Sequence, residues 1–177
     1  KPLRAGKGSY YEGGIREPFF FVLNGKIQPN RRSEVPITNL DIFPTVLQYA
    51  GVDESTLQLD GNNLTPVLEE EVQVFERPLF WHFPIYLQAY NVNDNENRDP
   101  LFRTRPGSVI RKGNWKLHYY FEDKGIELYN LSEDIGERNN LAKANPEKAA
   151  ALLADLQKWW KATNASIPNT PNPEYKE

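Results

Sequence analysis

The clearest alternation of apolar and polar positions lies in the carboxyl-terminal half of the chain. Two runs rich in β-branched and aromatic residues, Ser108–Lys112 and Trp115–Phe121, are separated only by a Gly-Asn pair, which predicts a β-hairpin. Since successive strand side chains point to opposite faces, the second run predicts one aromatic face and one polar face. Ile126–Tyr129 predicts a further strand. Residues 87–107, before the hairpin, are polar and rich in Asn and Asp, which predicts a long surface excursion.

A helix is predicted after these strands. Asn145 is a favoured capping residue, and Pro146 suits the first helical position. The positions that follow carry an apolar stripe at helical spacing, made of Ala149, Leu152, Leu153, Leu156 and Trp160. We expect this stripe to cover the aromatic face of the hairpin.

The first part of the chain predicts other elements. The continuous apolar run Phe19–Leu23 predicts a strand buried on both faces, as in a sheet covered by helices. Helical spacing of apolar residues predicts a helix that begins near Thr38, where Asp41 forms a weak capping box, and ends at Gly51. Leu79–Phe83 predicts a short aromatic strand.

Composition excludes several classes of function. The 177 residues are 39% hydrophobic and carry a net charge of −3 without a basic stripe, so we expect a folded protein that does not bind nucleic acid. No run approaches the ~18 apolar residues of a membrane span. The absence of cysteine excludes disulfides, thiol catalysis and zinc–thiolate sites. The two histidines lack carboxylates at metal-ligand spacing, so no metal site is expected.

Several segments, in order along the chain, resemble those of one enzyme family. They read LRAGKGSYYEGGIREPFFF, TNLDIFPTVLQYAG, LDGNNLTPVL, RPLFWHFP, SVIRKGNWKLHYYF and ELYNLSEDIGERNNLA. Together they resemble the carboxyl-terminal part of type I sulfatases, the formylglycine-dependent hydrolases of sulfate esters.

The resemblance implies an α+β fold in two parts. Residues 1–76 would be the end of an alkaline-phosphatase-like α/β core domain. Residues 77–177 would form a small antiparallel sheet packed with a carboxyl-terminal helix. A periplasmic, secreted or lysosomal location is implied by the family alone.

The same resemblance implies cofactors that this segment does not provide. Sulfatases carry a C/S-x-P-x-R motif, whose first residue becomes the formylglycine nucleophile, and paired aspartates that hold calcium. Here Ser166 is followed by Pro168, but Thr170 stands where the arginine is required, and the aspartates are not matched. Formylglycine and calcium are therefore expected only in a full-length parent, and the segment alone is expected to be inactive.

The resemblance assigns chemistry to Lys7, as a contact to the substrate sulfate. A compact ammonium with three donors suits a tetrahedral anion, and it stabilises charge that develops on the bridging oxygen. Gly6 and Gly8 would let the backbone approach closely. The alternative is an ordinary exposed lysine in a loop.

Other polar residues have structural alternatives. His82 resembles a residue of the active-site rim and is a substrate-binding candidate, with a purely structural histidine as the alternative. His118, on the polar face of the hairpin, is expected at a solvated or interface position. Glu12 and Arg16 flank a double glycine, and we expect an internal ion pair there that braces the turn carrying Lys7.

Two functions remain open. The first is the carboxyl-terminal part of a sulfatase that hydrolyses sulfate monoesters, with the remainder of the parent chain and a sulfated carbohydrate as partners. The second is a non-catalytic glycan-binding or packing module. Trp159 and Trp160 could form a sugar-stacking platform, but adjacent helical positions point about 100° apart, which favours packing. Phosphatase or phosphodiesterase relatives are disfavoured by the KGSYYEGG segment.

Overall fold

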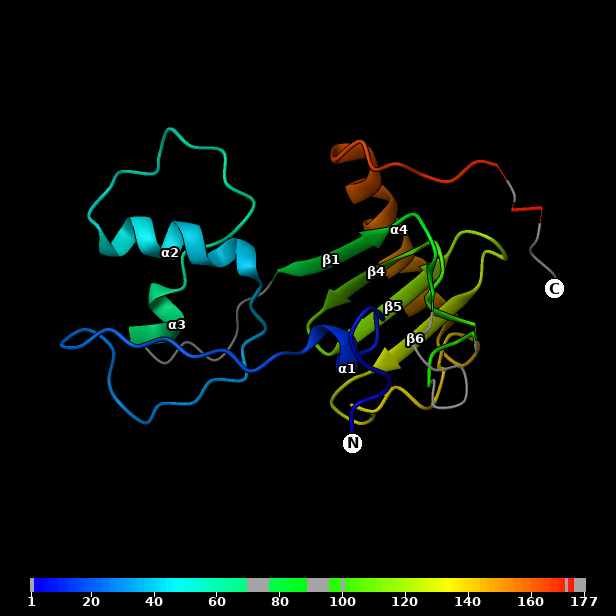
Figure 1. Cartoon of the computed structure of the whole chain (residues 1–177), viewed down its shortest axis with the longest axis horizontal. Coiled ribbons are helices and arrows are strands. Elements are labelled where there is room, and N and C mark those ends of the chain that lie inside the picture. The colour runs from blue at the N-terminus through cyan, green and yellow to red at the C-terminus, as the bar shows by residue number, and fades with distance from the viewer. Residues whose placement is uncertain (1, 70–76, 89–95, 100, 171, 174–177) are drawn as a thin grey trace. The chain divides into compact units, whose positions relative to one another are not determined.

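The computed structural model describes residues 2–69, 77–88, 96–99, 101–170 and 172–173. The chain forms two compact units (Figure 1), one made of Lys1–Glu17 with Arg77–Glu177 and the other of Pro18–Glu76. The first seventeen residues thus belong with the carboxyl-terminal sheet. The division into residues 1–76 and 77–177 concerns a parent enzyme and stays a prediction.

The larger unit is built on a four-stranded antiparallel sheet in the order β1-β4-β5-β6. Its strands are β1 (Pro78–Phe83), β4 (Gly107–Lys112), β5 (Trp115–Tyr120) and β6 (Ile126–Asn130). The predicted hairpin is β4–β5, in which Ile110 lies opposite Leu117, and Leu117 in turn lies opposite Leu128 on β6. This register aligns apolar positions of neighbouring strands on one face. The strand predictions for this region are confirmed.

Helix α4 (Pro146–Ala162) covers that face, as predicted (Figure 1). The core between them contains Ile110, Leu117, Leu128, Ala149, Leu152 and Leu156, each at most 6% exposed. Trp159 stacks on Phe80 with ring centroids 4.8 Å apart, and Trp160 packs against Tyr119 at 5.4 Å. Both tryptophans therefore pack against the sheet, and the fold is α+β.

The opposite face of the sheet is covered by the amino-terminal segment, which ends in the short helix α1 (Glu12–Ile15). Tyr10 packs there on Tyr120. Lys116 and His118, on this polar face, are fully buried. The expectation of a solvated His118 is therefore wrong. Alternation assigns a residue to a face, but it cannot reveal that a segment 104 residues away along the chain covers that face.

Two short paired strands interrupt the stretch predicted as a surface excursion, namely β2 (Leu87–Gln88) and β3 (Phe102–Thr104). Asp99 and Thr104 are buried, so the prediction of an exposed excursion is wrong for this part. Asp99 accepts a hydrogen bond from the Leu101 backbone N–H at 2.6 Å and pairs with Arg105, and these partners allow a polar residue to be buried. Positions 89–95 and 100 lie outside the described residues.

The smaller unit contains the helix predicted after Thr38. Its elements are the 3-10 turn η1 (Asn39–Asp41), α2 (Ile42–Tyr49) and α3 (Thr65–Glu69). The predicted capping box is present, since the Thr38 backbone N–H donates to the Asp41 carboxylate at 2.7 Å. Asp41 is fully buried and also accepts from the Asn62 N–H at 2.9 Å, which joins the helix start to the following loop. No helix in the described ranges is long and apolar enough to cross a membrane.

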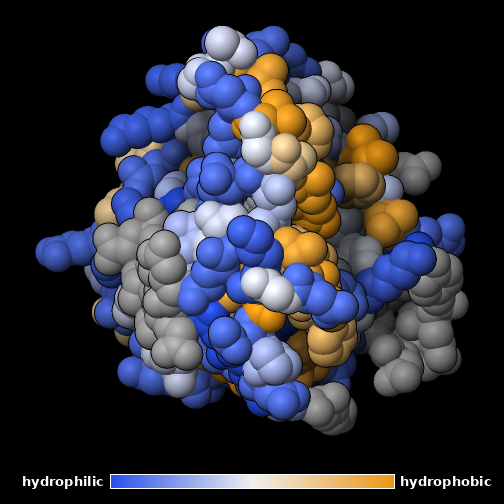
Figure 2. Space-filling model, turned by 90° about the vertical axis from the view of Figure 1, so that its left-hand side faces the viewer, coloured by the Kyte–Doolittle hydropathy of each residue, from blue (hydrophilic) through white to orange (hydrophobic). Residues whose placement is uncertain are grey.

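The prediction of a buried strand at Phe19–Leu23 is wrong. These residues have no regular secondary structure, and Phe20 and Val22 are 85% and 83% exposed. A strand buried on both faces needs neighbouring strands to pair with its backbone, and no strand of the described residues pairs with this segment. Other exposed apolar side chains of the unit are Leu40, Ile42, Phe43, Val46, Val52 and Leu57. Figure 2 shows apolar residues, in orange, that reach the surface on the side seen there.

Candidate functional site

Lys7 lies in a tight turn of the amino-terminal segment. The Ser9 backbone N–H closes the turn by donating to the Gly6 carbonyl at 3.1 Å. Gly8 has a φ of +88°, which L side chains rarely adopt, and a Cβ at this position would lie 2.6 Å from Leu87. The Lys7 side chain is exposed, and no hydrogen bond or ion pair engages its ammonium within the described part of the chain. The structure thus presents an exposed ammonium on a constrained turn.

A double glycine at the start of α1 contacts the backbone of this turn. A Cβ on Gly13 would lie 2.3 Å from the Arg4 carbonyl oxygen, and one on Gly14 would lie 2.4 Å from the Ser9 carbonyl oxygen. The Gly13 N–H donates to the Arg4 carbonyl at 3.0 Å. Glycine therefore lets α1 lie directly against the segment that carries Lys7.

Four buried polar residues lie where α1 meets the sheet, and we call them the buried ion cluster: Glu12, Lys116, His118 and Glu137, each at most 1% exposed. The Lys116 ammonium lies 3.0 Å from Glu12 Oε1 and 2.9 Å from Glu137 Oε1. Arg111 lies 3.5 Å from the other Glu12 oxygen, so two cations balance two carboxylates. Buried charges require such pairing, because an isolated ion is costly to remove from water.

The predicted ion pair between Glu12 and Arg16 is present but long, at 3.9 Å. The Arg16 side chain is 43% exposed, whereas Lys116 is fully buried and closer to Glu12. Glu12 is therefore held mainly by a partner on β5, which local spacing could not indicate.

Protonation within the cluster is set by burial and by its hydrogen bonds. Burial lowers the pKa of His118 below its usual 6.5, despite its hydrogen bond with Glu137, so the imidazole is neutral at neutral pH. Burial alone would raise the pKa of Glu137, but the hydrogen bond from His118 and the charge of Lys116 lower it to about 2. Because an ionised carboxylate only accepts, His118 donates its Nε2–H to Glu137 at 3.1 Å.

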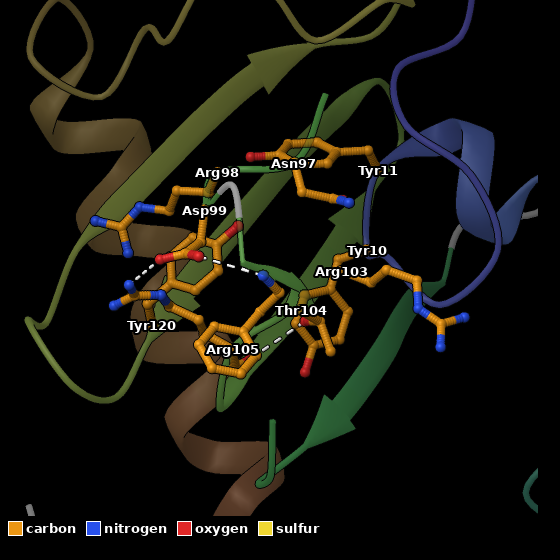
Figure 3. A pocket seen from close by; sticks show the side chains of 10 residues that line it. Tyr10, Tyr11, Asn97, Arg98, Asp99, Arg103, Thr104, Arg105 and Tyr120 are labelled. Atoms are coloured by element: carbon orange, nitrogen blue, oxygen red, sulfur yellow. Dashed lines mark hydrogen bonds and ion pairs between the residues drawn. The ribbon is translucent and has the colours of Figure 1, made fainter. Parts of the chain in front are cut away.

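A small pocket lies between the amino-terminal segment and residues 97–99 and 102–105 (Figure 3). Its volume of about 10 Å³ admits about one water molecule. In Figure 3 the side chains of Asp99 and Arg105 point toward one another, whereas that of Arg103 points away from them. Arg105 also pairs with Glu122 at 2.9 Å. The Asp99 and Arg105 side chains that line the pocket are paired with each other. The pocket is too small to hold a carbohydrate.

Both ring nitrogens of His82 have hydrogen-bond partners. Nδ1 lies 2.7 Å from Ser108 Oγ, and Nε2 lies 3.0 Å from the Ser166 carbonyl oxygen. Since a carbonyl only accepts, Nε2 carries the proton and Nδ1 accepts from the Ser108 hydroxyl. Ser108 Oγ in turn accepts from Trp160 Nε1–H at 2.9 Å. These bonds agree with the structural alternative for His82, and its contact with substrate stays a prediction.

Comparison with models of protein families identifies the family to which the chain belongs. The family model described as N-sulphoglucosamine sulphohydrolase, C-terminal, matches residues 6–165. The chain belongs to the sulfatase family. The matched region is the carboxyl-terminal one, in agreement with the resemblance of the sequence segments.

Relatives of this sulfatase chain match it along nearly its whole length. A sulfatase of Formosa agariphila is 37% identical over 93% of this chain and 30% of its own length. The steryl-sulfatase of Rattus norvegicus is 40% identical over 96% of this chain and 32% of its own length. The crystal structure of Ps i-CgsB in complex with k-i-k-neocarrahexaose has a TM-score of 0.68 at 26% identity, covering 89% of this chain and 32% of that one. The chain thus spans about a third of the length of these sulfatases.

The residues that the structure describes do not fit the metal that the sulfatase family implies. Its described part holds no group of three His, Asp or Glu side chains able to bind a metal ion. The buried carboxylates of Glu12 and Glu137 are both paired with Lys116 and are not available as donors.

Sequence reasoning missed the buried ion cluster of this sulfatase chain. Lys116 occupies a position that alternation assigns to a polar face, and nothing in the pattern indicates that this face is buried. Glu137 lies in the sulfatase-like segment ELYNLSEDIGERNNLA, and this is the one signal that could have marked it.

Proposed function

We propose that this chain is the carboxyl-terminal part of a sulfatase that hydrolyses sulfate monoesters, and that Lys7 contacts the substrate sulfate. Family membership over residues 6–165 carries the proposal. The exposed Lys7 ammonium, on a turn whose backbone is tightly packed, supports the role assigned to it.

The chemistry proposed for Lys7 is electrostatic. A sulfate monoester is an anion, and cleavage of its S–O bond places further charge on the bridging oxygen. An ammonium held at these oxygens stabilises the transition state more than the ground state, most effectively where water is excluded. Three N–H donors on one compact charge match a tetrahedral anion.

The rest of the reaction is assigned to other parts of the parent enzyme. The sequence contains no C/S-x-P-x-R motif, and the described residues offer no metal donor set, so formylglycine and calcium would be held by the remainder of the parent chain. The exposed apolar side chains of Pro18–Glu76 support packing of that unit against this remainder, as the end of the core domain. Residues 77–177 would be the carboxyl-terminal subdomain.

We propose a sulfated carbohydrate as the substrate class. The similar crystal structure of Ps i-CgsB is a complex with k-i-k-neocarrahexaose, which supports this choice. The rat relative is named a steryl-sulfatase, so turnover of a sulfated oligosaccharide and of a steroid sulfate should be compared directly. His82, which is partly exposed, is proposed at the rim of the substrate site, where it would exchange its bond to Ser166 for one to the substrate.

Replacement of Lys7 in the full-length parent tests the assignment. Lys7→Ala is expected to lower kcat on an aryl sulfate by at least ~10²-fold, the scale of losing one oxyanion donor. Lys7→Arg should recover part of this loss because it keeps the positive charge. Lys143→Ala removes another exposed loop lysine of the same unit and should leave kcat unchanged. Unchanged turnover in Lys7→Ala would rule out the assignment and favour a non-catalytic glycan-binding or packing module.

A further inference from the structure

We propose that Glu137 is a positioning residue, which fixes the turn carrying Lys7 by holding both ends of the segment from Arg4 to Glu12. The proposal rests on the role proposed for Lys7 and deepens it. Glu137 acts through the backbone of this segment, with no contact to the substrate.

The first end of the segment is held by the Glu137 main chain. Arg4 Nη1 donates to the Glu137 carbonyl oxygen at 2.9 Å and to the Tyr129 hydroxyl at 3.2 Å. The Arg4 guanidinium also lies 3.9 Å from the centre of the Tyr11 ring. Several contacts therefore fix the Arg4 side chain. The contact with Glu137 joins two residues that are 133 positions apart in the sequence.

The second end is held by the Glu137 side chain. Its Oε2 accepts from the Glu12 backbone N–H at 2.5 Å, where α1 begins. Its Oε1 lies 2.9 Å from the Lys116 ammonium, which in turn contacts the Glu12 carboxylate at 3.0 Å. Glu137 thus contacts Glu12 directly through the backbone and indirectly through Lys116, in a region closed to solvent.

The segment between these two ends forms a closed loop. The N–H of Gly13, the residue after Glu12, donates to the Arg4 carbonyl at 3.0 Å, so the backbone beside the second end also bonds to the first end. Gly13 and Gly14 leave no space for even a methyl group between α1 and the turn. A shift of Glu12 would therefore move the backbone that carries Lys7, because close-packed groups transmit displacement.

An ionised carboxylate is required at position 137 because all its partners are donors. Oε2 faces a backbone N–H, and Oε1 faces the Lys116 ammonium and the Nε2–H of His118. A glutamine would place its own N–H₂ group against one of these donors and would remove one of the two charges that balance Lys116. The N–H of Glu12 or the side chain of Lys116 would then have to move.

A double-mutant cycle in the full-length sulfatase tests the proposal. The kcat on an aryl sulfate is measured for the parent, Glu137→Gln, Lys7→Ala and the double variant. Because small misplacement of a catalytic group has large effects, Glu137→Gln is expected to lower kcat about 10-fold when Lys7 is present and less than about 2-fold when it is absent. A merely structural role would lower kcat by the same factor in both backgrounds.

A control separates positioning from loss of stability. Leu156→Ala makes a cavity in the core beneath α4, on the face of the sheet opposite the amino-terminal segment, and should lower the unfolding temperature while leaving kcat unchanged. If Leu156→Ala lowers kcat as much as Glu137→Gln does, the positioning role is overturned.

The outcomes distinguish this inference from the proposed function. Unchanged kcat in Lys7→Ala overturns the role of Lys7 itself. A low kcat in Lys7→Ala, combined with equal effects of Glu137→Gln in both backgrounds, overturns only the positioning role.

If Glu137→Gln does not fold, Arg4→Gln takes its place in the same cycle, since it removes the other contact to Glu137 at a partly buried position. The same loss of effect in the Lys7→Ala background is then expected, and equal effects again overturn the proposal.

Discussion

At the scale of single residues, Lys116 shows that the contribution of an ion pair to stability depends on how deeply the pair is buried. Its ammonium has no exposed surface and lies within 3.0 Å of two carboxylates. Removing one partner of such a buried group typically costs about 3–5 kcal/mol, because the remaining charge is left unpaired. Lys112 and Asp155 are as close, at 2.8 Å, but their side chains are 56% and 31% exposed. An exposed pair of this kind contributes only about 0–1 kcal/mol.

The buried ion cluster makes stability depend on pH, with the same sign for two of its members. In the unfolded chain His118 regains its usual pKa of 6.5 and Glu137 its usual 4.5, so each binds protons more readily there than in the fold. The contribution of His118 is complete above pH 6.5 and is lost as the pH falls below that value. The contribution of Glu137 is present above pH 4.5 and is lost as the pH falls toward about 2.

We therefore predict that the free energy of unfolding of the parent enzyme decreases between about pH 7.5 and pH 5.5, where an unfolded histidine becomes protonated. In His118→Gln, whose amide can still donate to Glu137, this decrease should be smaller. Urea unfolding followed by tryptophan fluorescence at the two pH values measures both. An identical decrease in the parent and in His118→Gln would contradict the neutral, buried state assigned to this imidazole.

At the scale of elements, α1 packs so closely against the amino-terminal segment that its two glycine positions leave no space for a side chain. It is only four residues long, and its stability comes from contacts with the amino-terminal segment and the sheet rather than from its own hydrogen bonds. The Gly13 and Gly14 positions face backbone oxygens closer than 3 Å to where a Cβ would lie.

Gly13→Ala is accordingly expected to destabilise the protein by about 1–3 kcal/mol, the range for overpacking a filled site. Gly6→Ala is the matched control, since a Cβ at Gly6 would meet no atom within 4 Å. Urea midpoints of the two variants provide the comparison. Equal stability of the two would show that α1 does not lie against the turn as described.

The elements also show what the sequence could predict. Local patterns were sufficient for the β4–β5 hairpin, for α4 with its apolar stripe, and for the capping box of Thr38 and Asp41. Local patterns could not reveal which segment covers the polar face of β5, because the covering residues lie more than 100 positions away. The buried ion cluster follows from that long-range contact and was missed for the same reason.

At the scale of the whole molecule, the Phe19–Leu23 segment shows that an apolar sequence pattern does not by itself determine whether a segment is buried. Its composition is that of a strand buried on both faces, yet Phe20 and Val22 are almost fully exposed. The composition and the exposure agree if the remainder of a parent sulfatase covers this unit, as proposed. The chain's span of about a third of its relatives' length is consistent with that arrangement. Lys7 could be singled out from the sequence only through its family resemblance, since a lone lysine carries no signal of its own.

The proposed function depends on contact between the Lys7 ammonium and the sulfate of the substrate. A crystal structure of the full-length parent with inorganic sulfate bound tests it most directly. In that structure, Lys7 Nζ is expected to lie about 3 Å from a sulfate oxygen, at hydrogen-bonding distance. Sulfate in the active site of the assembled enzyme, with the Lys7 ammonium pointing into bulk solvent, would contradict the proposed contact.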